Sequence, residues 1–359
     1  MYEIIIVGGG PAGAIAGKLL ASAGKKVLLF QQDFDFKKPC GGGIRFDAFD
    51  EFGIDKSIIK KTVNEIVLQS KTKKIEFNIS DTPLAIVDRT EFDKALRYDA
   101  QIAGTEILEA KVTDVKVLDS FVEVYVKTDQ KVKKYTAKYL IAADGVLSTV
   151  RKKVKNEEVS KVLTHYTDIA DFKTEKCYFY FGKDLSYHAY AWRFPYYDGT
   201  DIGVFTPSGS KKYINNFLHF LHITQKPKIK GYFIPLWQKT LFYENRVFYA
   251  GDAASFVMPF TFEGIYYAMK SAKIVSDVII KDVDFREYEK RWNSLYYKKF
   301  KILKYLQEFF LKSDLKISLM MKLLTNPTVK QKVLLLWMDQ YELKIDKMFF
   351  LKIAKKIIK

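Results

Sequence analysis

The stretch that decides the fold reads YEIIIVGGGPAGAIAGKLLASAGKKVLLFQQ and spans residues 2–32. Its first six residues are rich in apolar, β-branched side chains, which is typical of a strand buried on both faces. After a glycine-rich turn, apolar residues recur at helical spacing up to Gly24, and residues 26–30 form a second short apolar run. Strand, turn, helix and strand in this order predict one βαβ unit.

Three glycines of the turn follow the G-x-G-x-x-G spacing, and each has a mechanical reason. Gly8 permits a tight turn, Gly10 lets backbone approach a pyrophosphate, and Gly13 lets helix and strand pack closely. The phosphate would lie at the helix N-terminus, beside Pro11 and Ala12. The turn therefore predicts a dinucleotide site.

The residue expected to hydrogen-bond the adenosine ribose is usually acidic and lies at the end of the second strand. This chain has Gln31, Gln32 and Asp33 there. The Gln31 amide can still hydrogen-bond a hydroxyl, and Asp33 lies two residues further on. The alternative is that these are solvated loop residues.

A chain of 359 residues can bury a large core and should hold two or three structural units. Hydrophobic residues at 48% and aromatic residues at 15% fit a globular enzyme. The aromatic share suits a long apolar ligand tunnel, although core packing explains most of it equally well.

The two cysteines, Cys40 and Cys177, make no disulfide framework, and four scattered histidines add no metal-ligand spacing. We therefore expect no metal and a reducing compartment. No run of eighteen apolar residues predicts a transmembrane helix, and the first strand begins too early for a signal peptide. The expected location is cytoplasmic, or peripheral on the inner face of the membrane.

The formal net charge of +17 has two readings. A general lysine bias would leave it as a solvated surface. Alternatively it serves anionic partners, namely phospholipid headgroups, a diphosphate substrate or an acidic electron-donor protein. We expect no nucleic-acid partner, because no nucleic-acid-binding module is recognised.

Strand and helix patterns along the rest of the chain predict an α/β (α+β overall) fold. Residues 47–61 are expected to form a short helix, residues 63–87 a hairpin-rich insertion of three strands, and residues 107–140 antiparallel strands. A helix over residues 88–103 would be capped by Asp88 or Thr90. The glycine-rich residues 37–44 fit neither helix nor regular strand.

These patterns predict three parts: a Rossmann-like dinucleotide-binding domain, which the family resemblance described below makes an FAD-binding domain, an inserted antiparallel-sheet substrate domain, and a helical C-terminal region. Their expected residues are 1–62, 88–157 and 240–283 for the first, 63–87 and 158–239 for the second, and 284–359 for the third.

Four motifs in chain order carry a family resemblance. They are the glycine turn, Arg89 in D-R-x-x-F-D, the Asp144-Gly145 turn, and Gly251-Asp252 followed by two alanines. Their order resembles FAD-dependent oxidoreductases of the aromatic-hydroxylase type. Three further stretches are similar to the geranylgeranyl reductase family in particular: KPCGGG at 38–43, Y-x-W-x-F-P at 190–195, and T-x-EGIYYAM at 261–269. The resemblance spans residues 1 to about 280.

This resemblance implies FAD as cofactor. Asp252, at the end of a buried strand, can hold ribityl and ribose hydroxyls, and the helix N-termini near Gly13 and Gly264 would face the phosphates and the pyrimidine edge of the flavin. The other residues that the resemblance assigns to the cofactor are Cys40, Gly41, Gly42, Arg89, Asp144, Gly145, Gly251, Glu263 and Ile265.

Cys40 would lie beside the reactive face of the flavin if the resemblance holds, and Tyr190 and Trp192 would wall the pocket for a carbon–carbon double bond. The thiol could supply a proton or pack against the alkene, or Cys40 could be a small buried hydrophobe with no chemical role. The two aromatic residues alternate on one strand face, so they could floor a prenyl channel or belong to the core. Phe194, Pro195 and Phe262 complete the expected pocket.

The chain departs from the family pattern beside the flavin. Ser255, Met258 and Phe262 stand where the family commonly has glycine, asparagine and glycine. Together with Gln31, this puts the particular substrate in doubt more than the cofactor.

Residues 300–359 contain thirteen lysines, no arginine and five acidic residues. Over residues 343–359 the apolar and lysine side chains fall on opposite faces of a helix. Such a helix can lie on an anionic membrane or pack on the body of the protein with its lysines outward.

The expected function is reduction of isolated C=C bonds in a prenyl chain, by hydride transfer from flavin N5. Substrates would be geranylgeranyl diphosphate, a geranylgeranyl lipid or a quinone side chain. The alternatives are a flavin monooxygenase of an aromatic or quinone-precursor ring, and a membrane-associated electron carrier to quinone. With one dinucleotide fingerprint in view, the electron donor is NAD(P)H or a ferredoxin-like protein.

Overall fold

The predicted βαβ unit forms at the amino terminus and contributes two strands to the largest sheet. The computed structural model describes residues 1–128, 131–196, 199–207, 209–238 and 240–338, so the amphipathic helix predicted over residues 343–359 lies outside the described residues. Its strands are β1 (Tyr2–Val7), β2 (Val27–Gln31), β3 (Gly43–Arg45), β4 (Ile59–Val63), β5 (Glu65–Ser70), β6 (Lys74–Asn78), β7 (Leu84–Val87), β8 (Glu106–Glu109), β9 (Lys111–Val117), β10 (Val122–Lys127), β11 (Val132–Ala142), β12 (Lys161–Ile169), β13 (Cys177–Phe181), β14 (Ala191–Pro195), β15 (Thr200–Thr206), β16 (Lys230–Pro235), β17 (Tyr243–Glu244) and β18 (Val247–Tyr249).

The helices cover the sheets and make up the described part of the carboxy-terminal region. They are α1 (Pro11–Ser22), α2 (Asp47–Phe52), α3 (Arg89–Ile102), α4 (Thr149–Lys155), α5 (Lys212–Phe220), α6 (Ile265–Ile280), α7 (Arg286–Trp292), α8 (Lys298–Phe310), α9 (Asp314–Leu323) and α10 (Pro327–Trp337), with short turns η1 (Lys56–Ile58) and η2 (Gly251–Ala254) and a π-helical turn η3 (Asn293–Tyr297). Along the described residues, no helix is both long and apolar enough to cross a bilayer.

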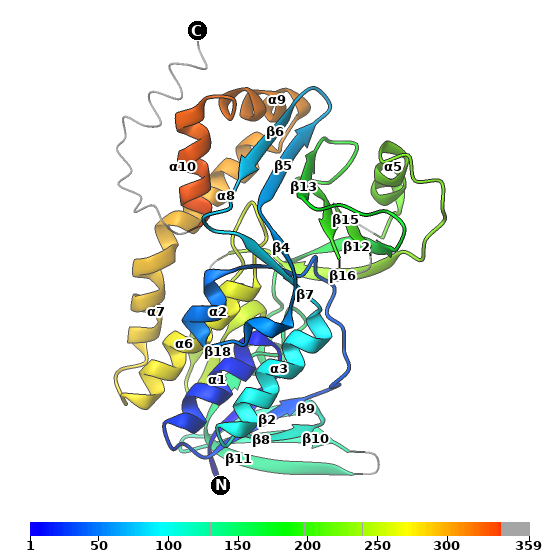
Figure 1. Cartoon of the computed structure of the whole chain (residues 1–359). Helices are drawn as coiled ribbons and strands as arrows, with labels where there is room; N and C mark the ends of the chain where they lie inside the picture. Colours follow the sequence, from blue (N-terminus) through cyan, green and yellow to red (C-terminus); the bar gives the residue numbers. More distant parts are fainter. Residues whose placement is uncertain (129–130, 197–198, 208, 239, 339–359) are drawn as a thin grey trace.

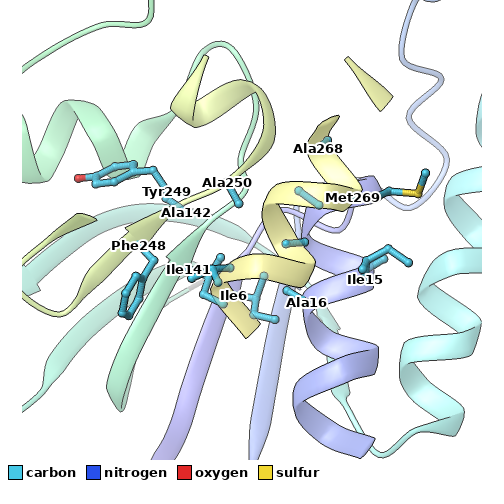
Figure 2. Close-up of a cluster of buried hydrophobic side chains, with 14 of the residues drawn as sticks. Ile6, Ile15, Ala16, Ile141, Ala142, Phe248, Tyr249, Ala250, Ala268 and Met269 are labelled. Carbon is cyan, nitrogen blue, oxygen red and sulfur yellow. The ribbon is translucent and has the colours of Figure 1, made fainter. Parts of the chain in front are cut away.

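An eight-stranded sheet runs in the order β17-β18-β11-β1-β2-β8, and β10 pairs with β11 while β9 pairs with β10. Its central pairings, β18 to β11, β11 to β1, β1 to β2 and β2 to β8, are parallel. Helices α1, α3 and α6 lie against this sheet (Figure 1). Side chains from α1 and α6 meet those of β1, β11 and β18 in one buried cluster (Figure 2). Strands β1, β2 and β18 are largely buried, which explains their continuous apolar sequences, whereas the edge strand β8 is partly exposed.

A seven-stranded sheet has the order β16-β12-β15-β14-β13-β5-β6 and is antiparallel except where β13 pairs with β5. Helices α8, α9 and α10 gather beside the β5 and β6 end of this sheet (Figure 1). The apolar side chains of α9 join those of β5, β13 and β14 in a second buried cluster. The helical region therefore supports the sheet that the sequence associates with substrate.

A three-stranded sheet, β3-β7-β4, connects these parts and corrects the expectation for residues 84–87. We grouped β7 with β5 and β6, but β7 pairs with β3 and β4 instead. The backbone N–H of Val87 donates to the carbonyl of Gly42 at 3.1 Å, and a Cβ on Gly42 would lie 2.5 Å from the carbonyl oxygen of Val87. Glycine therefore permits a close backbone contact, and Gly43–Arg45 is regular strand, contrary to expectation.

Two further expectations were wrong. The helix predicted over residues 47–61 ends at Phe52, because Gly53 adopts the left-handed conformation (φ 59°) that terminates helices. The strands over residues 107–140 are not all antiparallel, because α3 carries the chain across the sheet and β8 pairs parallel with β2. The predicted Asp88 cap is confirmed: its carboxylate accepts from the N–H groups of Thr90 and Glu91. The boundaries of the three predicted parts stay a prediction.

Candidate active site

A pocket lies between the seven-stranded sheet and the first turns of α1 and α6. Its walls include most of the residues predicted for catalysis and substrate, with several predicted for the cofactor: Pro11, Cys40, Gly41, Arg89, Tyr190, Trp192, Phe194, Asp252, Phe262, Glu263, Gly264 and Ile265. Predicted residues outside this lining are Gly8, Gly10, Ala12, Gly13, Gln31, Gln32, Gly42, Asp144, Gly145, Pro195 and Gly251.

The glycine turn leaves room for a cofactor at one point and is filled by protein at another. A Cβ on Gly10 would have no atom within 4 Å, whereas a Cβ on Gly13 would lie 1.8 Å from the carbonyl oxygen of Gly8. Helix α1 begins at Pro11, so its first backbone N–H groups lack intrahelical partners. The turn therefore fits a phosphate group at the helix N-terminus.

Gln31 holds the glycine turn from the end of β2. Its amide oxygen accepts from the backbone N–H of Gly9 at 2.7 Å, and its amide nitrogen donates to the carbonyl of Asp33 at 2.8 Å. Arg97 of α3 donates to the carbonyl of Gly9 at 3.1 Å. Gln31 thus shapes the turn, while Gln32 is exposed.

Asp252 follows β18, at the end where the sheet faces the pocket. Its carboxylate forms an ion pair with the Lys38 ammonium at 2.5 Å. Burial alone would lower the pKa of Lys38, but the Asp252 carboxylate outweighs this and raises the pKa. Lys38 belongs to the KPCGGG stretch, but the sequence alone suggested no individual role for it.

Cys40 is exposed and lies in the pocket beside Arg89. Its sulfur accepts from the backbone N–H of Gly42 at 3.4 Å. Arg89, buried on α3, contacts both oxygens of Asp93 at 3.0 to 3.1 Å. Burial alone would lower the pKa of Arg89, but Asp93 and the Cys40 sulfur raise it. The exposure of Cys40 does not fit the alternative of a buried hydrophobe.

Asp144 and Gly145 lie in the turn between the end of β11 and the first residue of α4. The Asp144 carboxylate accepts from the Ser148 hydroxyl at 2.5 Å and from the Val150 N–H at 3.0 Å. Burial raises the pKa of Asp144. Gly145 has a left-handed φ of 81°, and a Cβ there would have no atom within 4 Å. Asp144 therefore organises the turn, and Gly145 leaves open space beside it.

Aromatic side chains build the apolar wall of the pocket. The Tyr190 hydroxyl donates to the carbonyl of Thr261, and burial raises the pKa of Tyr190. The Phe262 ring lies 4.3 Å from that of Phe205, between centroids. A Cβ on Gly41 would lie 2.2 Å from Cδ2 of Phe194, so this ring lies directly on the glycine-rich loop. The wall therefore joins β14 to the loop that carries Cys40.

Comparisons with known proteins show a family model and relatives that match this chain. A family model described as FAD binding domain matches residues 1–182. The geranylgeranyl diphosphate reductase of Synechocystis is 27% identical over 352 residues, covering 88% of this chain and 86% of the relative. The digeranylgeranylglycerophospholipid reductase of Methanococcus vannielii is 28% identical over 357 residues, covering 90% and 88%. This chain belongs to the family of flavoproteins that carry this FAD-binding domain, and along most of its length it is similar to geranylgeranyl reductases.

The fold of this flavoprotein is shared with a solved structure. A geranylgeranyl bacteriochlorophyll reductase-like protein from Thermoplasma acidophilum superposes with a TM-score of 0.75 at 19% identity, covering 93% of this chain and 99% of that one. FAD is the cofactor of the family, and the open space at Gly10 and Gly145 fits it. The residues that would hold FAD are the glycine turn, the first turn of α1, Asp252 and the start of α6.

Sequence reasoning missed the side of the pocket that other strands and helices supply. These lining residues are Lys38, Thr164, Tyr166, Phe179, Phe205, Phe233, Ile234, Pro235 and Trp337. Alternation along β12 puts Thr164 and Tyr166 on one face, but it does not say which face meets a pocket. Trp337 carries no local signal, because it reaches the site through the docking of α10.

Proposed function

We propose that this oxidoreductase saturates isolated C=C bonds of a prenyl chain. One observation carries the proposal: a pocket with an aromatic wall from β14 ends at a polar corner holding Cys40, Arg89 and Asp252. A long apolar chain fits the wall, and the polar corner adjoins the expected cofactor site. The two reductases to which the chain is similar, by their names, act on geranylgeranyl compounds, which supports the same substrate class here.

The chemistry needs a hydride at one alkene carbon and a proton at the other. Reduced FAD, when bound, supplies the hydride. The protein's own task is to align the double bond and exclude water, because an isolated alkene is a poor hydride acceptor. The aromatic wall performs the alignment through contact with Tyr190, Trp192 and Phe194.

Cys40 is our candidate for the proton donor. After the S–H proton moves to the alkene carbon, the negative sulfur keeps the Gly42 N–H and lies beside the Arg89 guanidinium. After the product leaves, water enters and returns a proton to the sulfur, and the hydroxide passes to solvent. Tyr190 is a weaker donor, because burial raises the pKa of its phenol and its hydroxyl already donates to Thr261. We assign Tyr190 to lining the pocket.

The proposed substrates are geranylgeranyl diphosphate, a geranylgeranyl lipid and a quinone side chain. The proposed electron donor is NAD(P)H or an acidic, ferredoxin-like protein, which the basic surface would attract.

Anaerobic turnover tests this function. The reduced protein is mixed with geranylgeranyl diphosphate, a geranylgeranyl lipid or menaquinone, and the product is weighed by mass spectrometry. We expect a gain of about two mass units per saturated bond together with reoxidised flavin. An oxygen atom gained in air would indicate the monooxygenase, and a reduced quinone with an unchanged side chain would indicate the electron carrier.

Cysteine variants test the proton donor. Cys40→Ala should slow the saturation step by about 10²-fold or more when the variant and the wild type are compared at equal FAD loading. Cys177→Ala is the matched control, because this second cysteine is buried on β13 outside the pocket lining. Equal loss in both variants would contradict a chemical role for Cys40.

A further inference from the structure

The Trp192 ring packs directly against the neighbouring strand, β15. Strands β14 and β15 pair antiparallel with Trp192 opposite Gly203. A Cβ on Gly203 would lie 2.0 Å from Cζ2 of the indole and 2.3 Å from Cη2. Any side chain at position 203 would therefore displace the ring. Glycine here is required by the indole and not by the backbone, because the residue lies in a regular strand.

The indole is also held at its polar edge. Its Nε1–H donates to the carboxylate of Asp201, two residues before Gly203 on the same strand. Asp201 is 3% exposed and Trp192 is 7% exposed. A buried carboxylate is costly unless it is hydrogen-bonded, so this contact satisfies two groups that would otherwise be unfavourable.

We propose that Asp201 and Gly203 are positioning residues that hold the Trp192 indole in one orientation and thereby set the width of the prenyl pocket. The inference rests on the proposed function for the identity of the ligand. The inference about the orientation of the ring depends only on its contacts with Asp201 and Gly203. A ring fixed at both its face and its edge presents a constant surface to the chain, whereas a mobile ring would align the double bond poorly.

The surroundings of Asp201 make this contact sensitive to pH. Asp168 on β12 lies opposite Asp201 and is itself paired with Lys230 of β16 at 3.1 Å. The other groups that act on Asp201 are Lys37, from the loop before the Cys40 motif, and Tyr166 on β12. Burial, reinforced by Asp168, raises the pKa of Asp201 to about 7.

The sign of the effect follows from the hydrogen bond. The indole N–H favours the ionised carboxylate, because a charged acceptor forms the stronger bond. Trp192 is therefore held more firmly above pH 7 than below it. We expect the KM for the prenyl substrate to rise about fivefold as the pH falls from 8 to 6, with a smaller change in kcat.

Two substitutions at position 201 separate positioning from plain stability. Asp201→Asn keeps an acceptor oxygen but does not titrate, so its KM should lose this dependence on pH. Asp201→Ala removes the acceptor and should raise KM about tenfold at pH 8. The proposal is overturned if Asp201→Asn keeps the full pH dependence, or if Asp201→Ala binds substrate as the wild type does.

The fluorescence of Trp192 gives a readout that needs no turnover. Subtracting the spectrum of Trp192→Phe isolates the emission of this indole from the other three tryptophans. Gly203→Ala and Asp201→Ala should shift that emission, and geranylgeraniol should quench it less than in the wild type. Gly209→Ala is the matched control, because a Cβ there meets no atom within 4 Å.

The kinetic and the fluorescence measurements together show whether the proposed function or the positioning proposal is wrong. If the wild type reduces no prenyl chain but the emission of Trp192 still depends on Asp201 and Gly203, the proposed function is wrong and the positioning contacts stand. If prenyl reduction occurs and none of these variants changes KM or emission, the positioning proposal is wrong.

Discussion

Two glycines of the amino-terminal turn are required for different reasons. Gly10 leaves open space where a Cβ would lie, but Gly13 touches the backbone of Gly8. One position therefore makes room for a ligand and the other for the protein itself.

Replacing these two glycines should separate cofactor binding from folding. Gly10→Ala should weaken FAD binding at least tenfold and change the stability of the flavin-free protein by no more than about 1 kcal/mol. Gly13→Ala should destabilise that protein by about 2 kcal/mol or more, because its Cβ would meet the Gly8 carbonyl. FAD titration by fluorescence and thermal unfolding measure both. A large stability loss in Gly10→Ala would refute this division.

The backbone of Phe262 is strained. From the sequence, this position stood out only because the family commonly has glycine there. Its φ is 56°, in the left-handed region that costs about 1 kcal/mol for residues with a Cβ. Both Phe262→Ala and Phe262→Gly remove the ring, but the glycine variant alone relieves the backbone. We expect Phe262→Gly to be about 1 kcal/mol more stable than Phe262→Ala in chemical denaturation. Equal stabilities would mean that the loop relaxes in the alanine variant.

Individual elements are tied together by groups with more than one partner. Asp88 caps α3 and also accepts from the Tyr196 hydroxyl, and its carboxylate lies 3.6 Å from the Lys37 ammonium. The first helix turn of one part is thereby joined to the loop after β14. A helix cap in this chain is also a contact with the seven-stranded sheet.

Substitution of Asp88 should show both roles. Burial opposes ionisation, but the hydrogen bonds from Tyr196 and the Glu91 N–H, together with the charge of Lys37, lower the pKa of Asp88. A lowered pKa gives stability that is present above the ordinary value of about 3.9 and is lost as the pH falls through the folded value. Asp88→Ala should cost about 1 kcal/mol or more at pH 7, and Asp88→Asn less, because asparagine also caps.

Urea unfolding at pH 7 and pH 3 checks this element. The difference in stability between wild type and Asp88→Asn should shrink at the lower pH. A constant difference would show that the ion pair and the charged hydrogen bonds contribute nothing.

At the scale of the whole molecule, charge is the dominant feature. The chain carries a net charge of +17, which favours an anionic surface or an acidic partner over an uncharged one. Because a bilayer holds prenyl lipids, we propose that the protein binds peripherally to anionic membranes.

Vesicle sedimentation of the full chain tests this attraction. Binding to vesicles containing anionic lipid should be strong at low salt and fall as salt screens the charges, since each basic contact is worth about 1 kcal/mol. Uncharged vesicles are the control and should bind much less. Equal, salt-insensitive binding to both would indicate apolar insertion instead.

The sequence was sufficient to predict structure where all the residues that determine an element lie in one short segment. The apolar run of β1, the spacing of the glycines and the helical periodicity of α1 lie within 31 neighbouring residues, so the βαβ unit could be predicted from them. The KPCGGG and Y-x-W-x-F-P stretches likewise indicated the family, because they carry specific residues at fixed spacing.

Contacts between distant segments decided the rest. Strand β7 pairs with β3 and β4, and its backbone contacts Gly42. Asp252 forms its ion pair with Lys38, and the Trp192 ring packs on Gly203 of the next strand. Each of these depends on which surfaces pack together after folding, and periodicity along one segment carries no information about the partner that it meets. The sequence therefore determined the cofactor fold and the family, and the tertiary structure alone determined which side chains surround the pocket and hold its walls.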